Sequence, residues 1–233
     1  MIKTGKEHLN QLRDGRVVYI GNEKVDDVTT HPAFEKAAKK VAELYDIKHQ
    51  EIYKDILSYE EDGELCSTWF LQAKDKNDLR KRTKAHKIIA DQTSGMMGRS
   101  MDHVASFVTG MSTNPEIFDS GKYKFKNNLL NYYNFMKKND VFASYAVVPP
   151  QAARNPEFYQ KQNLPIPTLS VVKENKKGVI ISGMKMLATS AVFANEIWIG
   201  NLVPLAPDQV KQAITCAIPC NVEGLSLWMR QPL

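Results

Sequence analysis

The pattern of hydrophobic and polar positions changes in character near residue 140. Before that point, apolar residues recur three and four positions apart, which is the spacing of a helix with one buried face. The segment 31–47 shows this most clearly, because Phe34, Val41 and Leu44 fall on one side of the helix that it predicts. The same reasoning predicts further helices at 4–15, 76–93, 101–111 and 122–138.

Strand signals dominate after residue 140. One hairpin is already predicted before this point, at 16–27, with its turn at Gly21 and Asn22. After residue 140, several β-branched and aromatic runs follow one another and are separated by turn residues. They predict an antiparallel β region with strands in 141–150, 168–175, 178–189, 195–205 and 212–220. The last residues should lead into one more strand, whose edge would be uncovered, and this indicates a missing remainder or an unusual partner. The chain is therefore predicted to be α+β, with an N-terminal helical domain at 1–140 and a β domain, which need not be complete, at 141–233.

Composition and charge narrow the class of protein. Of the 233 residues, 43% are hydrophobic and 24% charged, as in ordinary globular proteins, and no apolar run is long enough for a membrane span. The polar N-terminus is unlike a secretory signal, so the cytoplasm is the expected location. The net charge of +5 favours anionic ligands. The basic run 80–87 has no interleaved aromatics and is interpreted as a solvated helix face, not a nucleic-acid site.

The three cysteines, Cys66, Cys216 and Cys220, argue against a disulfide framework because their number is odd. Cys216 and Cys220 have the spacing CxxxC, but a metal site would need further ligands nearby, and the chain has no histidine after His103. We therefore expect both to be small buried apolar side chains and predict no metal site.

Candidate chemistry is concentrated in the stretch SGMMGRSMDH, residues 94–103. Arg99 and His103 are four residues apart and share a helix face, so an anion-binding guanidinium would lie beside a group that titrates near neutrality. The glycines allow a tight turn, and methionines line adaptable apolar pockets. The alternative interpretation is a solvated pair at a helix start with the methionines in the core. Similarly, Gln151, Arg154 and Thr189 at strand ends are either turn residues or groups that recognise a planar heterocycle.

Several of these stretches, taken in order, resemble the 4-hydroxyphenylacetate 3-hydroxylase family, the oxygenase component of two-component flavin monooxygenases. The matching blocks are TGKEHLNQLRDGRVVYIGNEKVDDVTTHPAF, AHKIIADQTSGMMGRSMDH, PPQAAR and GVIISGMKMLATSAVFANE, and together they span about residues 4 to 228. The resemblance implies a fold related to acyl-CoA dehydrogenases, with a helical domain, a middle β-barrel-like domain and a C-terminal helical bundle. Since family members are about twice as long, this chain is expected to be a truncated form without that bundle.

The resemblance also implies an activity. Family members hydroxylate a phenol ortho to its hydroxyl, using O2 and reduced FAD that a separate flavin reductase supplies. The expected partners are thus the reductase and a small phenolic substrate, and full-length relatives are expected to form homo-oligomers. No nucleic acid or membrane partner is expected.

Residue by residue, the family motif Gly-Arg-Ser-Pro-Asp-Tyr places its substrate-binding arginine on Arg99 and its tyrosine on His103. A family histidine falls on Tyr145, so histidine and tyrosine have exchanged places, and the pair still offers an imidazole and a phenol to a substrate hydroxyl if both face one pocket. The implied catalytic residues are Arg99, His103 and Tyr145. The implied substrate-binding residues are Arg99, Ser100, Met101, Asp102, His103, Tyr145 and Asn201. The implied FAD-binding residues are Tyr145, Ala146, Val147, Gln151, Ala152, Ala153, Arg154 and Thr189.

The exchange puts 4-hydroxyphenylacetate itself in doubt and leaves a different phenol or a lost activity open. A second branch of the superfamily dehydrates 4-hydroxybutyryl-CoA with an iron–sulfur cluster, but it needs cysteines near the helical substrate segment and a later histidine. This chain has only Cys66 in its first half, so that branch is set aside. A non-enzymatic remnant that self-associates or binds another protein is the alternative of a different class.

Overall fold

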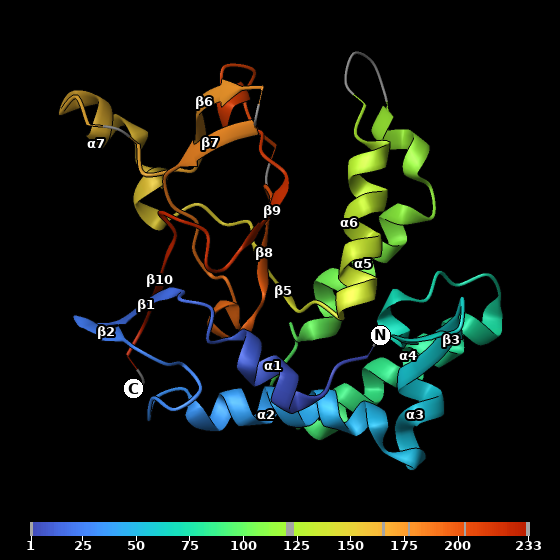
Figure 1. Cartoon of the computed structure of the whole chain (residues 1–233). Helices are drawn as coiled ribbons and strands as arrows, with labels where there is room; N and C mark the ends of the chain where they lie inside the picture. Colours follow the sequence, from blue (N-terminus) through green and yellow to red (C-terminus); the bar gives the residue numbers. More distant parts are fainter. Residues whose placement is uncertain (1, 120–123, 165, 177, 203, 232–233) are drawn as a thin grey trace.

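The computed structural model describes residues 2–119, 124–164, 166–176, 178–202 and 204–231, apart from the side chain of Arg154. Helices α1 to α4 form a layer at one end of the molecule, α5 and α6 rise from it side by side, and most strands stand on the other side (Figure 1). The helices are α1 (Gly5–Gln11), α2 (Glu35–Asp46), α3 (Glu51–Leu57), α4 (Lys76–Gln92), α5 (Met101–Ser112), α6 (Lys126–Asn139) and α7 (Pro156–Lys161). The strands are β1 (Val17–Ile20), β2 (Glu23–Val25), β3 (Ser58–Glu61), β4 (Glu64–Ser67), β5 (Ala143–Ala146), β6 (Ser170–Asn175), β7 (Gly178–Ser182), β8 (Glu196–Ile199), β9 (Cys216–Pro219) and β10 (Ser226–Met229).

Two of the predicted helices, α1 and α4, begin at residues whose side chains cap them. Thr4 and Glu7 make a reciprocal capping box at the start of α1, and the Asp75 carboxylate accepts the first free amides of α4. The helix expected over 31–47 begins only at Glu35, because the chain from His31 to Phe34 forms a turn before it. Of the helix expected at 122–138, residues 122 and 123 lie outside the described residues, and α6 starts at Lys126.

A short helix and a hairpin between α2 and α4 were not predicted from the sequence. They are α3 and the antiparallel pair β3–β4, which turns at Asp62 and Gly63, both with positive φ. An Asp-Gly dipeptide is a typical signal for such a tight turn, and it was the available clue.

The later strands do not form the purely antiparallel region expected. In the sheet β5-β8-β9, the strand β5 runs parallel to β8, and only β8 and β9 are antiparallel. Hydrophobic alternation has the same period in both kinds of pairing, so the pattern could not distinguish them. The expected barrel is also wrong for the described residues, whose strands form open two- and three-stranded sheets.

The last strand finds a partner at the other end of the chain. β10 pairs in parallel with β1, in register from Val17 opposite Ser226 to Ile20 opposite Met229, and Tyr19 stacks on Trp228 with ring centroids 4.4 Å apart. The prediction that this strand has an uncovered edge is therefore wrong for the edge that faces β1, because that edge is paired. The hairpin β1–β2 and the C-terminal strand make one sheet.

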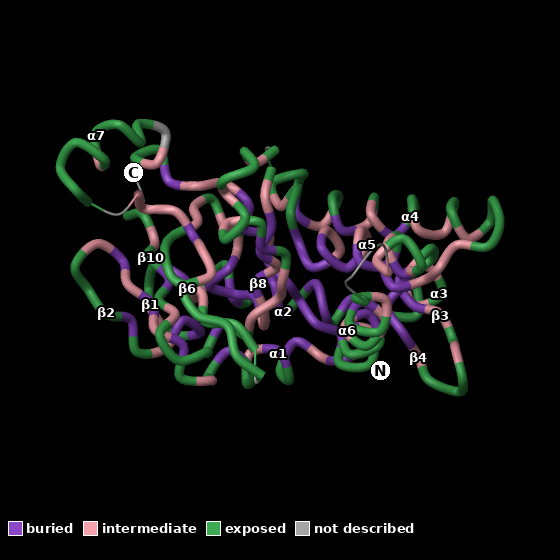
Figure 2. Tube along the Cα trace, turned by 90° about the horizontal axis from the view of Figure 1, so that it is seen from above, coloured by how far each residue is buried: buried purple, intermediate pink, exposed green. Residues whose placement is uncertain are grey.

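The buried residues form a continuous core that runs from the helical layer into the sheets (Figure 2). It contains charged groups as well as apolar ones. The side chains of Lys48 and Asp140 are 0% and 1% exposed, and the ammonium of Lys48 binds the carboxylate of Asp140 directly. Ser67 Oγ donates a hydrogen bond to the same carboxylate at 2.7 Å. This pair connects the turn after α2 to the end of α6, where Asp140 adopts a left-handed backbone conformation.

The basic run on α4 is largely solvated, as predicted. Lys81 and Arg82 are half-buried, and the Arg82 guanidinium donates to the carbonyls of Trp69 at 3.0 Å and Leu71 at 2.7 Å. Cys220 is buried as expected, whereas Cys216 is only half-buried.

Candidate functional site

The turn between α4 and α5 places Arg99 at the surface. Ser94 and Gly95 both have left-handed backbone conformations, and the amide of Gly95 donates to the carbonyl of Ala90 at 2.8 Å, which closes α4. Arg99 follows this turn directly before α5, and its side chain is exposed. The glycine-containing turn predicted from the sequence is thus confirmed.

Arg99, His103 and Tyr145 come together from two separate segments. The His103 ring, in the first turn of α5, meets the Tyr145 ring of β5 at 5.6 Å between centroids and an angle of 70°. The Arg99 guanidinium carbon lies 5.9 Å from the centre of the same tyrosine ring. The structure therefore brings the exchanged histidine and tyrosine into contact, while their role toward a substrate stays a prediction.

Two aromatic residues that were not predicted from the sequence extend this group. Phe107 lies one turn after His103 on α5, with ring centroids 5.5 Å from Tyr145 and 5.5 Å from Trp198. Trp198 stands beside Tyr145 because the two are register partners on β8 and β5. We call His103, Phe107, Tyr145 and Trp198 the aromatic wall. Phe107 could have been found from the sequence, because it lies four residues after His103 and therefore on the same face of the helix.

His103 is held in its neutral form by its surroundings. Burial lowers its pKa below the ordinary value, and the positive charge of Arg99 lowers it further, while Asp102 opposes both. Neither ring nitrogen has a hydrogen-bond partner among the described residues. A neutral imidazole with an unengaged nitrogen can accept a proton from a ligand that binds beside it.

The neighbours of His103 in the sequence do not join the aromatic wall. Met101 is fully buried in the core, and Ser100 is 1% exposed. Asp102 points to α4, where its carboxylate binds His86 Nδ1 at 2.5 Å and accepts from Ser100 Oγ at 2.5 Å. A direct role for these three residues in holding a substrate stays a prediction.

The segments expected to contact FAD lie next to each other. The amide of Met186 donates to the carbonyl of Val148 at 2.9 Å, and Ser144 Oγ donates to the carbonyl of Thr189 at 2.8 Å. These bonds bring the chain after β5 beside the chain that leads from β7 to the 3-10 helix Ala191–Phe193. The structure therefore places Thr189 beside β5 and Met186 beside the chain that follows β5.

The residues that are expected to contact FAD differ in their exposure. Ala146 and Val147 are buried, Ala153 is half-buried, and Gln151, Ala152 and Thr189 are exposed. The side chain of Arg154 lies outside the described residues. A role for these residues in holding FAD stays a prediction.

The side chain of Asn201 makes hydrogen bonds within the chain. Its side-chain oxygen accepts from Lys185 Nζ at 2.9 Å, and its amide nitrogen donates to the carbonyl of Gln212 at 3.0 Å. Lys185 also donates to the carbonyl of Gly200. These bonds tie three loops together, and a substrate contact by Asn201 stays a prediction.

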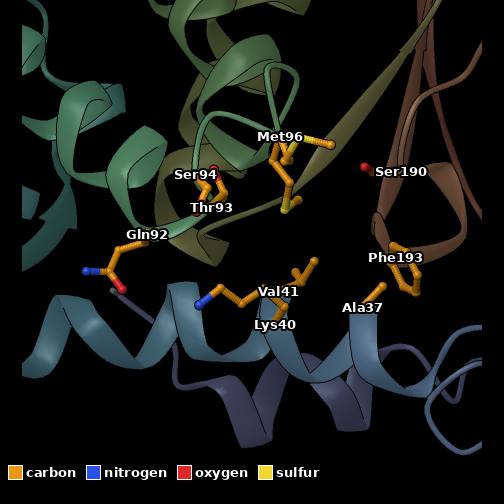
Figure 3. Close-up of a pocket in the computed structure, with 10 residues that line it drawn as sticks. Ala37, Lys40, Val41, Gln92, Thr93, Ser94, Met96, Ser190 and Phe193 are labelled. Carbon is orange, nitrogen blue, oxygen red and sulfur yellow. The ribbon is translucent and has the colours of Figure 1, made fainter.

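A pocket of about 400 Å³ opens between α2, the turn before Arg99 and the 3-10 helix Ala191–Phe193 (Figure 3). Met96 and Met97 line it, which agrees with the first of the two interpretations of this stretch, and Met96 is exposed and not in the core. Phe193 faces them across it, and Ser190 connects the pocket to the predicted flavin contact at Thr189. Further lining residues that the sequence did not point to are Ala37, Lys40, Val41, Gln92, Thr93 and Ser94.

Residues 4–233 match the family model described as 4-hydroxyphenylacetate 3-hydroxylase N terminal. The chain belongs to this family. Over its whole length it is 35% identical to the 4-hydroxyphenylacetate 3-monooxygenase oxygenase component of Thermus thermophilus, of which it covers 47%. It is 34% identical to the 2,4,6-trichlorophenol monooxygenase of Cupriavidus pinatubonensis, covering 45% of that protein. The chain therefore spans about half the length of these relatives.

Solved structures agree with the family. The oxygenase component of 4-hydroxyphenylacetate 3-monooxygenase complexed with FAD superposes with a TM-score of 0.88 at 34% identity, over 98% of this chain and 47% of that one. A 4-hydroxybutyryl-CoA dehydratase shares the fold at 21% identity, with a TM-score of 0.81 over 96% of this chain and 45% of that one. Within the described residues, no helix has the length and apolar character needed to cross a membrane.

Proposed function

We propose that this chain provides the phenol-binding wall and one side of the FAD site in the oxygenase component of a two-component monooxygenase. The reaction is hydroxylation of a phenol ortho to its hydroxyl, with reduced FAD supplied by a separate flavin reductase. The observation that carries the proposal is the convergence of Arg99, His103 and Tyr145 from segments far apart in the sequence. These are the positions at which the family motif implies substrate contacts.

The three side chains can each act on a phenol. The Arg99 guanidinium supplies positive charge and hydrogen bonds to a phenolate oxygen. His103, held neutral, accepts the proton from the phenol oxygen at a ring nitrogen, which makes the aromatic ring richer in electrons. Tyr145 presents its ring to the ligand and its hydroxyl as a further hydrogen-bond group.

FAD is assigned to the adjoining segments. Gln151 and Thr189 are exposed and offer hydrogen bonds, while Ala146 and Val147 are buried beneath this region next to Tyr145. When bound in its reduced form, the flavin activates O2, so that one oxygen atom enters the ring and the other leaves as water. The role of the protein is to hold the phenol beside the flavin and to exclude water from the reaction.

The substrate is proposed as a class. Relatives of similar identity are named for 4-hydroxyphenylacetate, 2,4,6-trichlorophenol and 4-nitrophenol, so the family accepts different ring substituents. The common chemical element is the phenolic hydroxyl, which is the group that Arg99, His103 and Tyr145 are suited to bind.

The test is an anaerobic calorimetric titration of reduced FAD into this chain, followed by titration of 4-hydroxyphenylacetate, 2,4,6-trichlorophenol and 4-nitrophenol. We expect micromolar binding of reduced FAD and binding of at least one phenol that Arg99→Gln weakens. Arg80→Gln, which removes an exposed arginine on α4, is the matched control and should leave phenol binding unchanged. Absence of FAD binding at every accessible concentration, or equal phenol binding by Arg99→Gln and the control, would overturn the proposal.

A further inference from the structure

His86 links α4 to α5 through hydrogen bonds on both of its ring nitrogens. Nδ1 binds the Asp102 carboxylate at 2.5 Å, and Nε2 lies 3.5 Å from the hydroxyl of Ser106. Among the described residues, every hydrogen bond that joins these two helices involves His86. His86 therefore supplies the polar contacts between two helices that are otherwise packed through the apolar core.

The two partners of His86 lie on the flank of α5 adjacent to the aromatic wall. Asp102 and Ser106 are four residues apart and share one side of the helix, as do His103 and Phe107. Because successive helical residues are about 100° apart, His86 holds one flank while the next flank faces Tyr145. A rotation of α5 that broke the His86 bonds would turn His103 away from Tyr145.

The start of α5 has no other side-chain cap. Ser100 is the N-cap residue, but its hydroxyl donates to Asp102 and makes no bond to the helix amides. The preceding turn contains two left-handed residues and is exposed. Asp102, fixed by His86 and Ser100 and 15% exposed, is thus the side chain that anchors the helix start between Arg99 and His103.

The connectivity Ser106–His86–Asp102 is also that of a hydrolase triad, but the geometry does not support hydrolysis. Ser106 lies in the middle of α5, where the neighbouring amides are engaged in helical hydrogen bonds. Stabilisation of an oxyanion needs free donors next to the nucleophile. A role in positioning accounts for the same contacts without that requirement.

We propose that His86 is a positioning residue for the phenol site, which holds the first turn of α5 so that His103 faces Tyr145. The proposal rests on the function proposed above insofar as phenol binding is concerned. The orientation of His103 is a property of the chain alone, and it can be measured without any ligand.

The test uses the chain as it exists and compares two amides at position 86. In His86→Asn the amide nitrogen stands near the place of Nδ1 and keeps the donor to Asp102, whereas in His86→Gln it reaches toward the place of Nε2 and leaves Asp102 without that donor. Lys84→Ala, two residues earlier on an exposed part of α4, is the matched control. The readout is the ring proton resonance of His103 by NMR, which the faces of Tyr145 and Phe107 shift from the position of a free imidazole.

We expect His86→Gln to return the His103 resonance toward that of a free imidazole, and His86→Asn and Lys84→Ala to preserve the shift. In the same samples, 4-nitrophenol should bind about tenfold more weakly to His86→Gln than to His86→Asn, the scale of one lost hydrogen bond. An unchanged His103 resonance in a folded His86→Gln variant would overturn the proposal. Should His86→Gln fail to fold, loss of the shift in a folded His86→Asn variant would overturn it instead. Failure of the wild-type chain to bind 4-nitrophenol would count against the proposed function, while the NMR result would still decide the role of His86.

Discussion

The imidazole of His103 meets the phenol ring of Tyr145 edge to face, with the ring centroids 5.6 Å apart. His103 lies at the start of α5 and Tyr145 in β5, the edge strand of a mixed sheet, so their contact joins the two kinds of structure in this chain. Arg99 stands over the same tyrosine ring and affects the charge state of the histidine. The predictions below test this site and the buried groups that support it.

Replacement of Arg99 by glutamine should raise the pKa of His103. Burial is the larger cause of its lowered pKa and remains in the variant, so the recovery toward the ordinary value should be partial. A pH titration of the His103 ring resonances by NMR measures this directly. Arg80→Gln on α4 is the control, and a His103 pKa that stays the same or falls in Arg99→Gln would contradict the electrostatic coupling.

Removal of the buried Lys48 ammonium should destabilise the fold strongly. Lys48→Met leaves the Asp140 carboxylate buried without its partner, which typically costs about 3–5 kcal/mol. The double variant Lys48→Met/Asp140→Asn should recover much of this loss, because asparagine tolerates the left-handed backbone and carries no charge. Urea unfolding gives the free energies.

The exposed pair of Lys39 and Glu35 on α2 provides the comparison for Lys48. Lys39→Met should cost less than about 1 kcal/mol, since both side chains are largely solvated. Equal losses for Lys39→Met and Lys48→Met would show that burial of the ion pair has no particular importance for stability.

Stability should fall as the pH drops below about 6.5, the ordinary pKa of histidine. His8 is fully buried, its Nε2 binds the carbonyl of Phe193, and its Nδ1 has no partner, so burial and the nearby Lys3 hold its pKa well below that value. The unfolded chain therefore binds a proton at His8 that the folded chain does not bind. The stability present above pH 6.5 is lost as the pH falls from 6.5 toward the pKa of His8 in the folded protein. One such group contributes a slope of at most about 1.4 kcal/mol per pH unit.

His8→Gln isolates this contribution, because its amide can keep the bond to Phe193 but does not titrate. Urea unfolding between pH 8 and pH 5 should show a shallower decline for the variant. Some decline remains, since the pKa of His103 is also lowered. Identical slopes in the two proteins would mean that His8 does not carry the effect.

Two glycine-to-alanine changes should have opposite effects on the stability of the fold. A β-carbon at Gly5 would lie 2.4 Å from the carbonyl oxygen of Ala42, so Gly5→Ala should separate α1 from α2 and destabilise the fold. At Gly110, within α5, nothing lies within 4 Å, and alanine there should stabilise by about 0.5–1 kcal/mol through its higher helix propensity. Thermal unfolding of both variants checks this, and a stabilised Gly5→Ala would refute the close packing.

The sequence by itself determined the longer helices and the local half of the site, whereas the short helices α3 and α7 were not predicted. Capping residues and apolar spacing are local, so α4 and α5 were predicted close to their observed bounds. The expectation that Arg99 and His103 share a helix face was wrong, because Arg99 lies in the turn before α5, which begins at Met101. The resemblance of the matched blocks added the family and the position of Tyr145.

The tertiary structure alone decided which distant surfaces meet. Strand alternation does not reveal that β5 pairs in parallel with β8, or that β10 returns to β1, because the period of side chains is the same in every pairing. Nor does a polar residue type reveal burial, so Lys48 and His8 gave no sign of their place in the core. The contacts of His86 with Asp102 and of His103 with Tyr145 exist only because packing fixes α5 between α4 and the sheet.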